Sequence, residues 1–294
     1  MKRKRGPGGR RGAFRIKDLD GVHKMMPYVM KSRCDSTVLF TMDIDMEPLR
    51  KLGARTKREG WHINTFLIVL IAMVRTVFDY PNMNRYIIGR RLYQKSYVDL
   101  SFVVKESMSM DGKDINVIVP FEMNETSDEI RKKITDCISK ARAGVDEGDT
   151  TINTIMKFPR FLLKGFFRFL MFLDFHGMFP NSFAEFDPMR SSLFVSNVGS
   201  IDIDMCYHHL YEWGTTSIFS TVGRVKKRPM CMPDGTVEAR DSITICFTID
   251  ERICDGYYIS KAINHLRKYL EKPETIFNMV LENEKDLHAK GAES

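Results

Sequence analysis

Residues 242–256, SITICFTIDERICDG, contain the most informative pattern of this chain of 294 residues. Apolar side chains recur at every second position, at Ile243, Ile245, Phe247 and Ile249. This period of two predicts a β-strand with one face in a core. The strand continues into Asp250–Gly256, where four ionisable side chains fall within six residues, and a pattern typical of an amphipathic helix follows. Such a charged strand-to-helix junction is a candidate catalytic site, with a structural ion-pair corner as the alternative.

Composition is that of an ordinary globular protein. Apolar residues make up 43% of the sequence and charged residues 28%. The formal net charge is +7, but six of the positive charges lie within the first twelve residues, MKRKRGPGGRRG. Because the remainder is close to neutral, we predict no nucleic-acid partner. Residues 1–14 are predicted to form a basic, disordered arm, and residues 15–294 a single domain.

The cysteines predict a reduced protein in the cytoplasm. They are scattered along the chain, without any CxxC pair, at Cys34, Cys137, Cys206, Cys231, Cys246 and Cys254. The amino-terminal residues lack the apolar segment of a signal peptide. No run reaches the roughly 18 apolar residues that a membrane span requires.

Hydrophobic periodicity predicts further strands and helices along the chain. Strands are expected at residues 36–46, 97–104, 115–121 and 217–223, with a turn at Met110–Lys113, and helices at 15–31, 47–59, 65–79 and 127–142. Asn64 is placed to cap the third of these helices. Thr126 and Glu129 have the spacing of a capping box at the start of the fourth helix.

Short motifs follow one another along the chain from the end of the predicted helix at 65–79 to the end of the strand at 242–250. They are Pro81-Asn82-Met83-Asn84, Val98-Asp99-Leu100, Val119-Pro120, Ser127-Asp128-Glu129-Ile130, Val195-Ser196-Asn197-Val198-Gly199 and Asp250–Gly256. In this order and spacing, residues 16–276 resemble the catalytic domain of the dihydrolipoyl acyltransferases of 2-oxo acid dehydrogenase complexes, and their relative chloramphenicol acetyltransferase. The resemblance implies an α/β two-layer sandwich, in which helices cover a mixed β-sheet, and assembly as a trimer.

The resemblance also implies a chemistry. The family transfers acyl groups between coenzyme A and an acceptor at a site shared by two subunits, and a histidine in the signature Asp-His-Arg-Val-x-Asp-Gly acts as base. A serine at the position of Ser196 donates a hydrogen bond to the oxyanion, with Asn197 beside it. An aspartate at the position of Asp255 holds the loop through an ion pair with a basic residue, and Arg252 is expected to be its partner or that of a neighbour. Coenzyme A or acyl-CoA is therefore the expected substrate, and no metal is predicted.

Glu251 stands where the family has its histidine base. Glutamate is ordinarily the weaker base by about two pKa units, which removes about 3 kcal/mol of driving force for accepting a thiol proton. Burial offsets that deficit, whereas a neighbouring guanidinium such as that of Arg252 opposes the offset. Two hypotheses remain. The chain is an acyltransferase weakened by loss of the histidine, or an inactive homologue that acts as a trimeric scaffold or as a membrane-surface or protein-binding module.

His208 and His209 are further candidates for a base. They lie between the Ser196 strand and the predicted strand at 217–223, where the family lines the acceptor end of its channel. Adjacent residues point to opposite sides, so at most one of the two is expected to face the site. A structural, hydrogen-bonded role is the alternative for both. The sequence shows neither zinc-ligand spacing nor a Gly-rich phosphate loop.

Residues 155–180 are an apolar insertion relative to the family. Within 158–173, Phe and Leu side chains dominate, and Arg160, Lys164 and Arg168 form one cationic stripe at helical spacing. This helix is expected to pack on a neighbouring subunit, with its basic edge in water, and a position in a membrane interface is the alternative. The sequence contains no lipoyl domain or lipoylation motif, so the acyl acceptor is expected to be a small molecule or the lipoyl domain of another protein.

Overall fold

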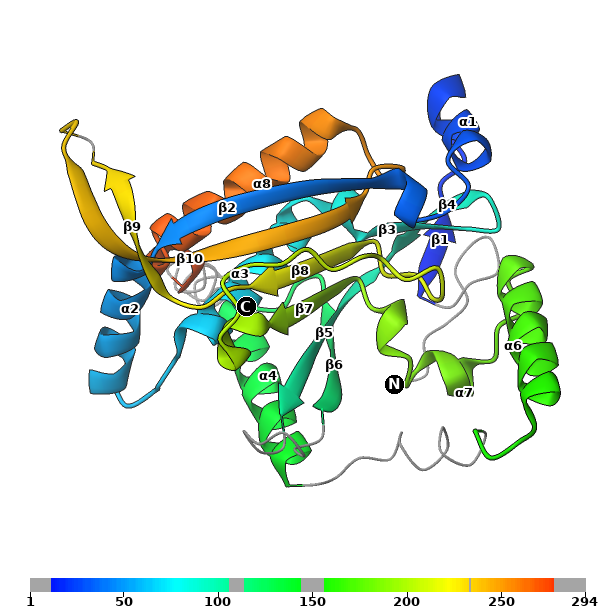
Figure 1. The fold of residues 1–294 in the computed structure, drawn as a ribbon, viewed down its shortest axis with the longest axis horizontal. Coiled ribbons are helices and arrows are strands. Elements are labelled where there is room, and N and C mark those ends of the chain that lie inside the picture. The colour runs from blue at the N-terminus through cyan, green and yellow to red at the C-terminus, as the bar shows by residue number, and fades with distance from the viewer. Residues whose placement is uncertain (1–11, 106–113, 144–155, 233, 278–294) are drawn as a thin grey trace, which may run out of the picture.

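A mixed β-sheet with helices on one face forms the body of the protein (Figure 1). The computed structural model describes residues 12–105, 114–143, 156–232 and 234–277. The strands of the main sheet are β2 (Thr37–Asp45), β5 (Tyr97–Lys105), β6 (Asp114–Glu122), β7 (Leu193–Asn197), β8 (Ile218–Val222), β9 (Lys226–Cys231) and β10 (Val237–Asp250). Their order is β2-β10-β8-β7-β5-β6, and β9 pairs with the first part of β10. The predicted two-layer α/β sandwich is therefore confirmed.

Strand β10 is the strand that the alternating pattern at 242–250 predicted. It is antiparallel to β2, β8 and β9, whereas β7 runs parallel to both β5 and β8. Ile245 and Ile249 are completely buried against the helices. The strand therefore places its charged end, at Asp250, inside the fold rather than at its rim.

The helices are α1 (Gly21–Val29), α2 (Met46–Arg58), α3 (Thr65–Asp79), α4 (Ser127–Arg142), α6 (Arg160–Phe175), α7 (Asn181–Ala184) and α8 (Gly256–Glu271). Short 3-10 helices occupy Cys34–Ser36, Pro81–Asn84, Pro188–Arg190 and Val198–Ile201. Helices α2, α3, α4 and α8 share one hydrophobic core with the sheet, and α3 lies at its centre. Both predicted caps are present. The side chain of Asn64 accepts a hydrogen bond from the backbone amide of Leu67 at the start of α3, and Thr126 and Glu129 form the full capping box at the start of α4.

The amino-terminal region differs from the sequence prediction. Ala13–Arg15 form a strand, β1, which pairs with β4 (Arg91–Lys95), and β4 pairs with β3 (Arg85–Ile88) to complete a small second sheet. The predicted boundary of the arm at residue 14 is therefore wrong, because ordered strand pairing begins at Ala13. The predicted helix at 15–31 is limited to α1. Residues 1–11 and the predicted turn at 110–113 lie outside the described residues.

Candidate active site at the end of β10

Strand β10 ends in a tight turn that carries Glu251. The backbone amide of Glu251 donates to the carbonyl of Ser36 (2.9 Å), and its side chain is half-buried. The preceding residue, Asp250, is fully buried and accepts a hydrogen bond from the hydroxyl of Ser36 (3.2 Å). The turn that carries the half-buried Glu251 is therefore hydrogen-bonded to the segment that precedes β2.

Arg252 contributes to this corner through a different partner from the one expected. Its guanidinium donates to both carboxylate oxygens of Asp250, at 2.8 Å from Nε and 2.7 Å from Nη2, and to the carbonyl of Met30 at 2.9 Å. The expected ion pair of Arg252 with Asp255 is therefore wrong within the chain. The physical reason is burial: Asp250 and Arg252 are both removed from water, so each charge needs the other nearby.

Asp255 is exposed and caps helix α8. Its side chain accepts the backbone amide of Tyr258 at 2.9 Å, which satisfies one of the amides that a helix start leaves unpaired. The aspartate of the signature thus holds the loop by capping a helix. The cap sets the direction in which α8 leaves the turn of Glu251.

Cys254 and Tyr258 attach the turn to the segment at residues 81–84. Cys254 is buried, with its sulfur 3.9 Å from that of Met83, and burial raises the pKa of its thiol to about 12. The hydroxyl of Tyr258 accepts the backbone amide of Asn82 at 3.2 Å. The Pro81–Asn84 motif and the signature motif, which are far apart in sequence, therefore contact each other directly.

A polar network that sequence reasoning missed lies on the other side of the turn. The buried Arg33 donates to the carbonyls of Ile87, Tyr211, Glu212 and Gly214, at 2.7–3.2 Å. Burial lowers the pKa of its guanidinium, and the charge of Asp250 opposes that effect. The carboxylate of Glu212 in turn accepts the amides of Arg33 and Cys34. No local pattern could reveal this network, because its members are up to 181 residues apart.

Arg33 and Arg252 line an open pocket of about 310 Å³ beside the turn. Lys31 and Arg90 also line it, as do residues of α1 and α6. The pocket near the corner that carries Glu251 is thus lined by cationic side chains together with the acidic Asp174 and Glu212.

Ser196 lies near the carboxyl end of β7 and is half-buried, as is Asn197. Ser196 is opposite Thr221 of β8, and Thr221 is opposite Cys246 of β10, five residues before Glu251. At about 3.3 Å per residue along a strand and about 4.8 Å between strands, Ser196 and Glu251 of one chain are roughly 20 Å apart. One chain therefore does not bring the two predicted site residues together.

His208 and His209 lie over the sheet face that carries Ser196. The ring of His208 stacks on Phe219 at 4.0 Å, and Phe219 stacks on Phe194, two residues before Ser196. The two histidine rings also stack on each other at 4.8 Å, with planes 20° apart. The expectation that they point to opposite sides is wrong, because the segment is an irregular loop rather than a strand. The stacking favours a packing role for His208.

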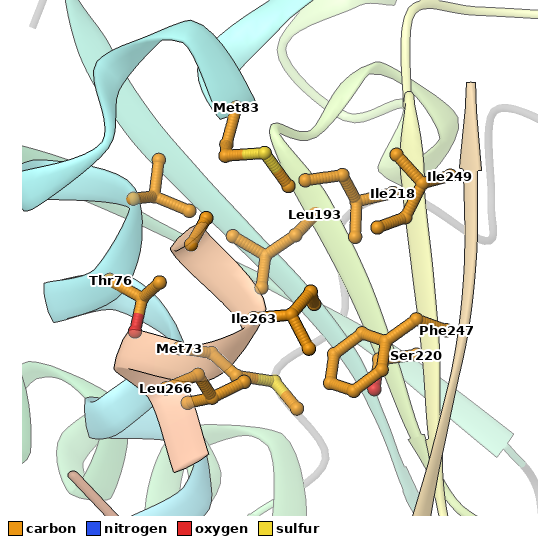
Figure 2. A pocket seen from close by; sticks show the side chains of 12 residues that line it. Met73, Thr76, Met83, Leu193, Ile218, Ser220, Phe247, Ile249, Ile263 and Leu266 are labelled. Carbon is orange, nitrogen blue, oxygen red and sulfur yellow. The ribbon is translucent and has the colours of Figure 1, made fainter. Parts of the chain in front are cut away.

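Another cavity lies inside the core, between the sheet and helices α3 and α8 (Figure 2). Its walls are apolar except for Thr76 and Ser220, and the volume is about 30 Å³. That volume accommodates about one water molecule, so this cavity is a packing gap rather than a substrate site.

A comparison with protein families decides the classification. The model of the 2-oxoacid dehydrogenases acyltransferase (catalytic domain) family matches residues 14–151 and 181–278, which include the Ser196 strand and the Glu251 turn. The chain belongs to this family. Residues 152–180, which contain α6, lie outside the match.

Individual relatives of this acyltransferase-family chain agree with the assignment. It is 22% identical over 218 residues to the lipoamide acyltransferase component of the branched-chain alpha-keto acid dehydrogenase complex of Bacillus subtilis (strain 168). That match covers 73% of this chain but 41% of the relative, so the chain spans less than half the length of that protein.

Solved structures show the same fold. A probable dihydrolipoamide acetyltransferase from Listeria monocytogenes 4b F2365 superposes with a TM-score of 0.56 at 16% identity, over 87% of this chain and 94% of the other. The cubic core of a pyruvate dehydrogenase multienzyme complex gives 0.57 at 13% identity, over 90% and 94%. A chloramphenicol acetyltransferase gives 0.55 at 15% identity, over 88% and 99%.

Proposed function

We propose that this chain is a coenzyme A-dependent acyltransferase whose active site is completed by a second copy of the chain. The family match across both the Ser196 strand and the Glu251 turn is the observation that carries the proposal. The separation of these two residues within one chain supports a shared site, in which Glu251 of one protomer meets Ser196 of the next, as in a trimer.

Each residue then has a defined task. The Glu251 carboxylate accepts the proton of the attacking thiol while the new carbon–sulfur bond forms at the acyl carbonyl. The hydroxyl of Ser196 donates a hydrogen bond to the oxyanion of the tetrahedral intermediate. When the bond to the leaving thiolate breaks, Glu251 returns the proton to it, so that protons and charges balance. The acyl acceptor is a small molecule or the lipoyl domain of another protein.

Complementation between two variants tests the shared site. Glu251→Gln and Ser196→Ala chains are each expected to lose most transfer of an acyl group to coenzyme A. Mixed oligomers regain activity, because about a quarter of randomly formed sites then join an intact Glu251 to an intact Ser196. Activity that stays at the level of the single variants would contradict a site between protomers.

Glu251 at the position of the family's histidine base favours a second candidate function, that of an inactive scaffold. Coenzyme A titration separates the two: an acyltransferase is stabilised against thermal unfolding by an amount that grows with the logarithm of the ligand concentration above Kd, whereas a scaffold shows no shift at millimolar coenzyme A. A rise in the unfolding temperature with coenzyme A but without any acyl transfer would support a coenzyme A binding site and contradict the proposed role of Glu251.

A further inference from the structure

Helix α6 is attached to the rest of the fold by one side only. Leu170 and Asp174 are its buried residues, and Asp174 forms a buried ion pair with Arg190, Nη2 to Oδ2 at 2.6 Å. Phe166 contacts Phe183 through its ring on the same side. The orientation of α6 is therefore fixed, and so is the identity of the side chains that it presents outward.

The outward side of α6 is strongly apolar. Phe161, Phe169 and Phe172 are 73%, 57% and 55% exposed. Other exposed apolar side chains of the helix are Leu162, Met171 and Phe175, whereas the ring of Phe167 packs against Trp213. A soluble protein rarely leaves so many large apolar groups together in water, so this surface is expected to be covered by a partner.

The cations of α6 form a strip next to the apolar surface. At about 100° of rotation per residue, Arg160, Lys164 and Arg168 occupy one arc of about 80°, and the adjoining arc holds Phe161, Phe172, Phe169 and Leu162. All three cations are exposed. The one acidic residue of the helix, Asp174, is buried in its pair with Arg190, so the outward half of α6 is purely apolar and cationic.

Helix α1 lies at the same end of the molecule as α6 (Figure 1). Its exposed residues include Val22, Met25, Tyr28 and Val29. Both helices border the pocket that Lys31 and Arg90 line, and both of these cations are exposed. The pocket therefore lies between the two helices, with Pro27 of α1 on one side and Met171 and Phe175 of α6 on the other.

We propose that α6, together with α1, binds the surface of a bilayer that contains anionic phospholipids. The helix lies in the plane of the interface, with its phenylalanines among the acyl chains and its cations at the level of the lipid phosphates. Among the described residues, no helix is both long and apolar enough to cross a membrane, which agrees with a helix that lies flat. This interaction surface goes beyond the proposed acyl transfer and does not depend on it.

Two observations favour lipid over a second copy of the chain as the occupant. The segment that contains α6 lies outside the region that the family model matches, so the shared acyltransferase fold does not require it. In addition, the outward half of α6 carries the Arg160–Arg168 strip and no carboxylate, which complements the phosphates of anionic lipids.

Vesicle sedimentation tests the proposal with the full chain. Vesicles of phosphatidylcholine mixed with phosphatidylglycerol are expected to bind the protein, and vesicles of phosphatidylcholine alone to bind it at least about tenfold more weakly. A charge-reversed variant, Arg160→Glu with Lys164→Glu and Arg168→Glu, is expected to lose the same factor or more. The double variant Phe161→Asp with Phe169→Asp is expected to bind neither the anionic nor the neutral vesicles.

The matched controls lie at the other end of the molecule. Lys57→Glu with Arg58→Glu reverses two exposed charges on α2, and Val237→Asp introduces a charge at an exposed apolar position of β10. Both are expected to bind vesicles like the original chain. Because the substituted side chains are exposed, thermal unfolding is expected to be unchanged in every variant.

Three outcomes would overturn the proposal. The first is that the original chain does not sediment with anionic vesicles. The second is equal binding to neutral and anionic vesicles, which would remove the role of the cationic strip. The third is that Phe161→Asp with Phe169→Asp dissociates the oligomer in sedimentation velocity while vesicle binding is unaffected, which would assign this face to a contact between copies.

Discussion

Asp250 and Arg252 form a buried two-bond ion pair that locks the turn carrying Glu251, with 0% and 4% of their side chains exposed. The pair lies two residues apart in sequence and contacts Ser36 and Met30 from a distant segment. It therefore joins the end of β10 to the residues that precede β2, and it fixes the position from which Glu251 acts in the proposed mechanism.

Arg252→Ala is expected to reduce the free energy of unfolding by about 3–5 kcal/mol, because it leaves the Asp250 carboxylate buried without its partner. Urea denaturation followed by circular dichroism measures this loss. Arg55→Ala is the control, since Arg55 pairs with Glu59 at the surface with 60% and 43% exposure and its loss should cost less than about 1 kcal/mol. Equal effects of the two substitutions would contradict the structural role of Arg252.

Asp255→Ala is expected to reduce the free energy of unfolding by about 1 kcal/mol through loss of the α8 cap, whereas Asp255→Asn should keep most of it. The same two variants show whether acyl transfer depends on the cap that Asp255 forms on α8 or on the negative charge of its side chain. If the cap is what matters, acyl transfer falls in the alanine variant and is retained in the asparagine variant. Loss of activity in a fully stable asparagine variant would show that the negative charge is required.

Glu251→His is expected to raise the turnover of acyl transfer to a thiol acceptor, since histidine is ordinarily the stronger base by about two pKa units. The increase in turnover is limited to about tenfold for each pKa unit of driving force that the histidine restores. Steady-state kinetics with coenzyme A measures it, and the matched control is His208→Gln, which should leave turnover unchanged. A histidine variant that is slower than the original chain would place the base elsewhere.

The buried thiol of Cys254 predicts a loss of stability in alkaline solution. Burial raises its pKa to about 12 in the folded chain, against about 8.5 for an ordinary cysteine. The folded state binds the proton more tightly, so this contribution is complete below about pH 8.5 and is lost as the pH rises toward 12. The free energy of unfolding is expected to fall by up to about 1.4 kcal/mol per pH unit in this window. Urea titrations should give a shallower slope for Cys254→Ala, and parallel curves would refute the assignment.

Position 223 has no room for a side chain larger than that of glycine. A Cβ atom at this position would lie 1.7 Å from the carbonyl oxygen of Asp204, so the loop over the Ser196 face would have to move away. Gly223→Ala is expected to reduce the free energy of unfolding by about 3 kcal/mol. Gly165→Ala in α6, where an added Cβ would meet no atom within 4 Å beyond the adjoining helix backbone, should instead stabilise the chain by about 0.5–1 kcal/mol, because it removes a mid-helix glycine. Thermal unfolding of the two variants should move in opposite directions.

Features determined by neighbouring residues were predictable from the sequence. The alternation at 242–250 gave β10, the spacing of Thr126 and Glu129 gave the start of α4, and Asn64 gave the start of α3. In each case the stabilising contact joins residues at most four positions apart, or depends on which side of one element faces the core. The motif order also led to the acyltransferase family, and the family model confirms it.

The sequence by itself therefore determined the elements with clear periodicity, the fold class and the family of this protein, because these depend on local spacing and on ordered motifs, whereas the small sheet of β1, β3 and β4 was not predicted. Only the tertiary structure decided which charges meet. Arg252 pairs with Asp250 rather than Asp255, Arg33 contacts carbonyls as far away as Gly214, and His208 stacks on Phe219. These contacts depend on burial, since a charge removed from water must find a partner from whichever distant segment the fold brings to it.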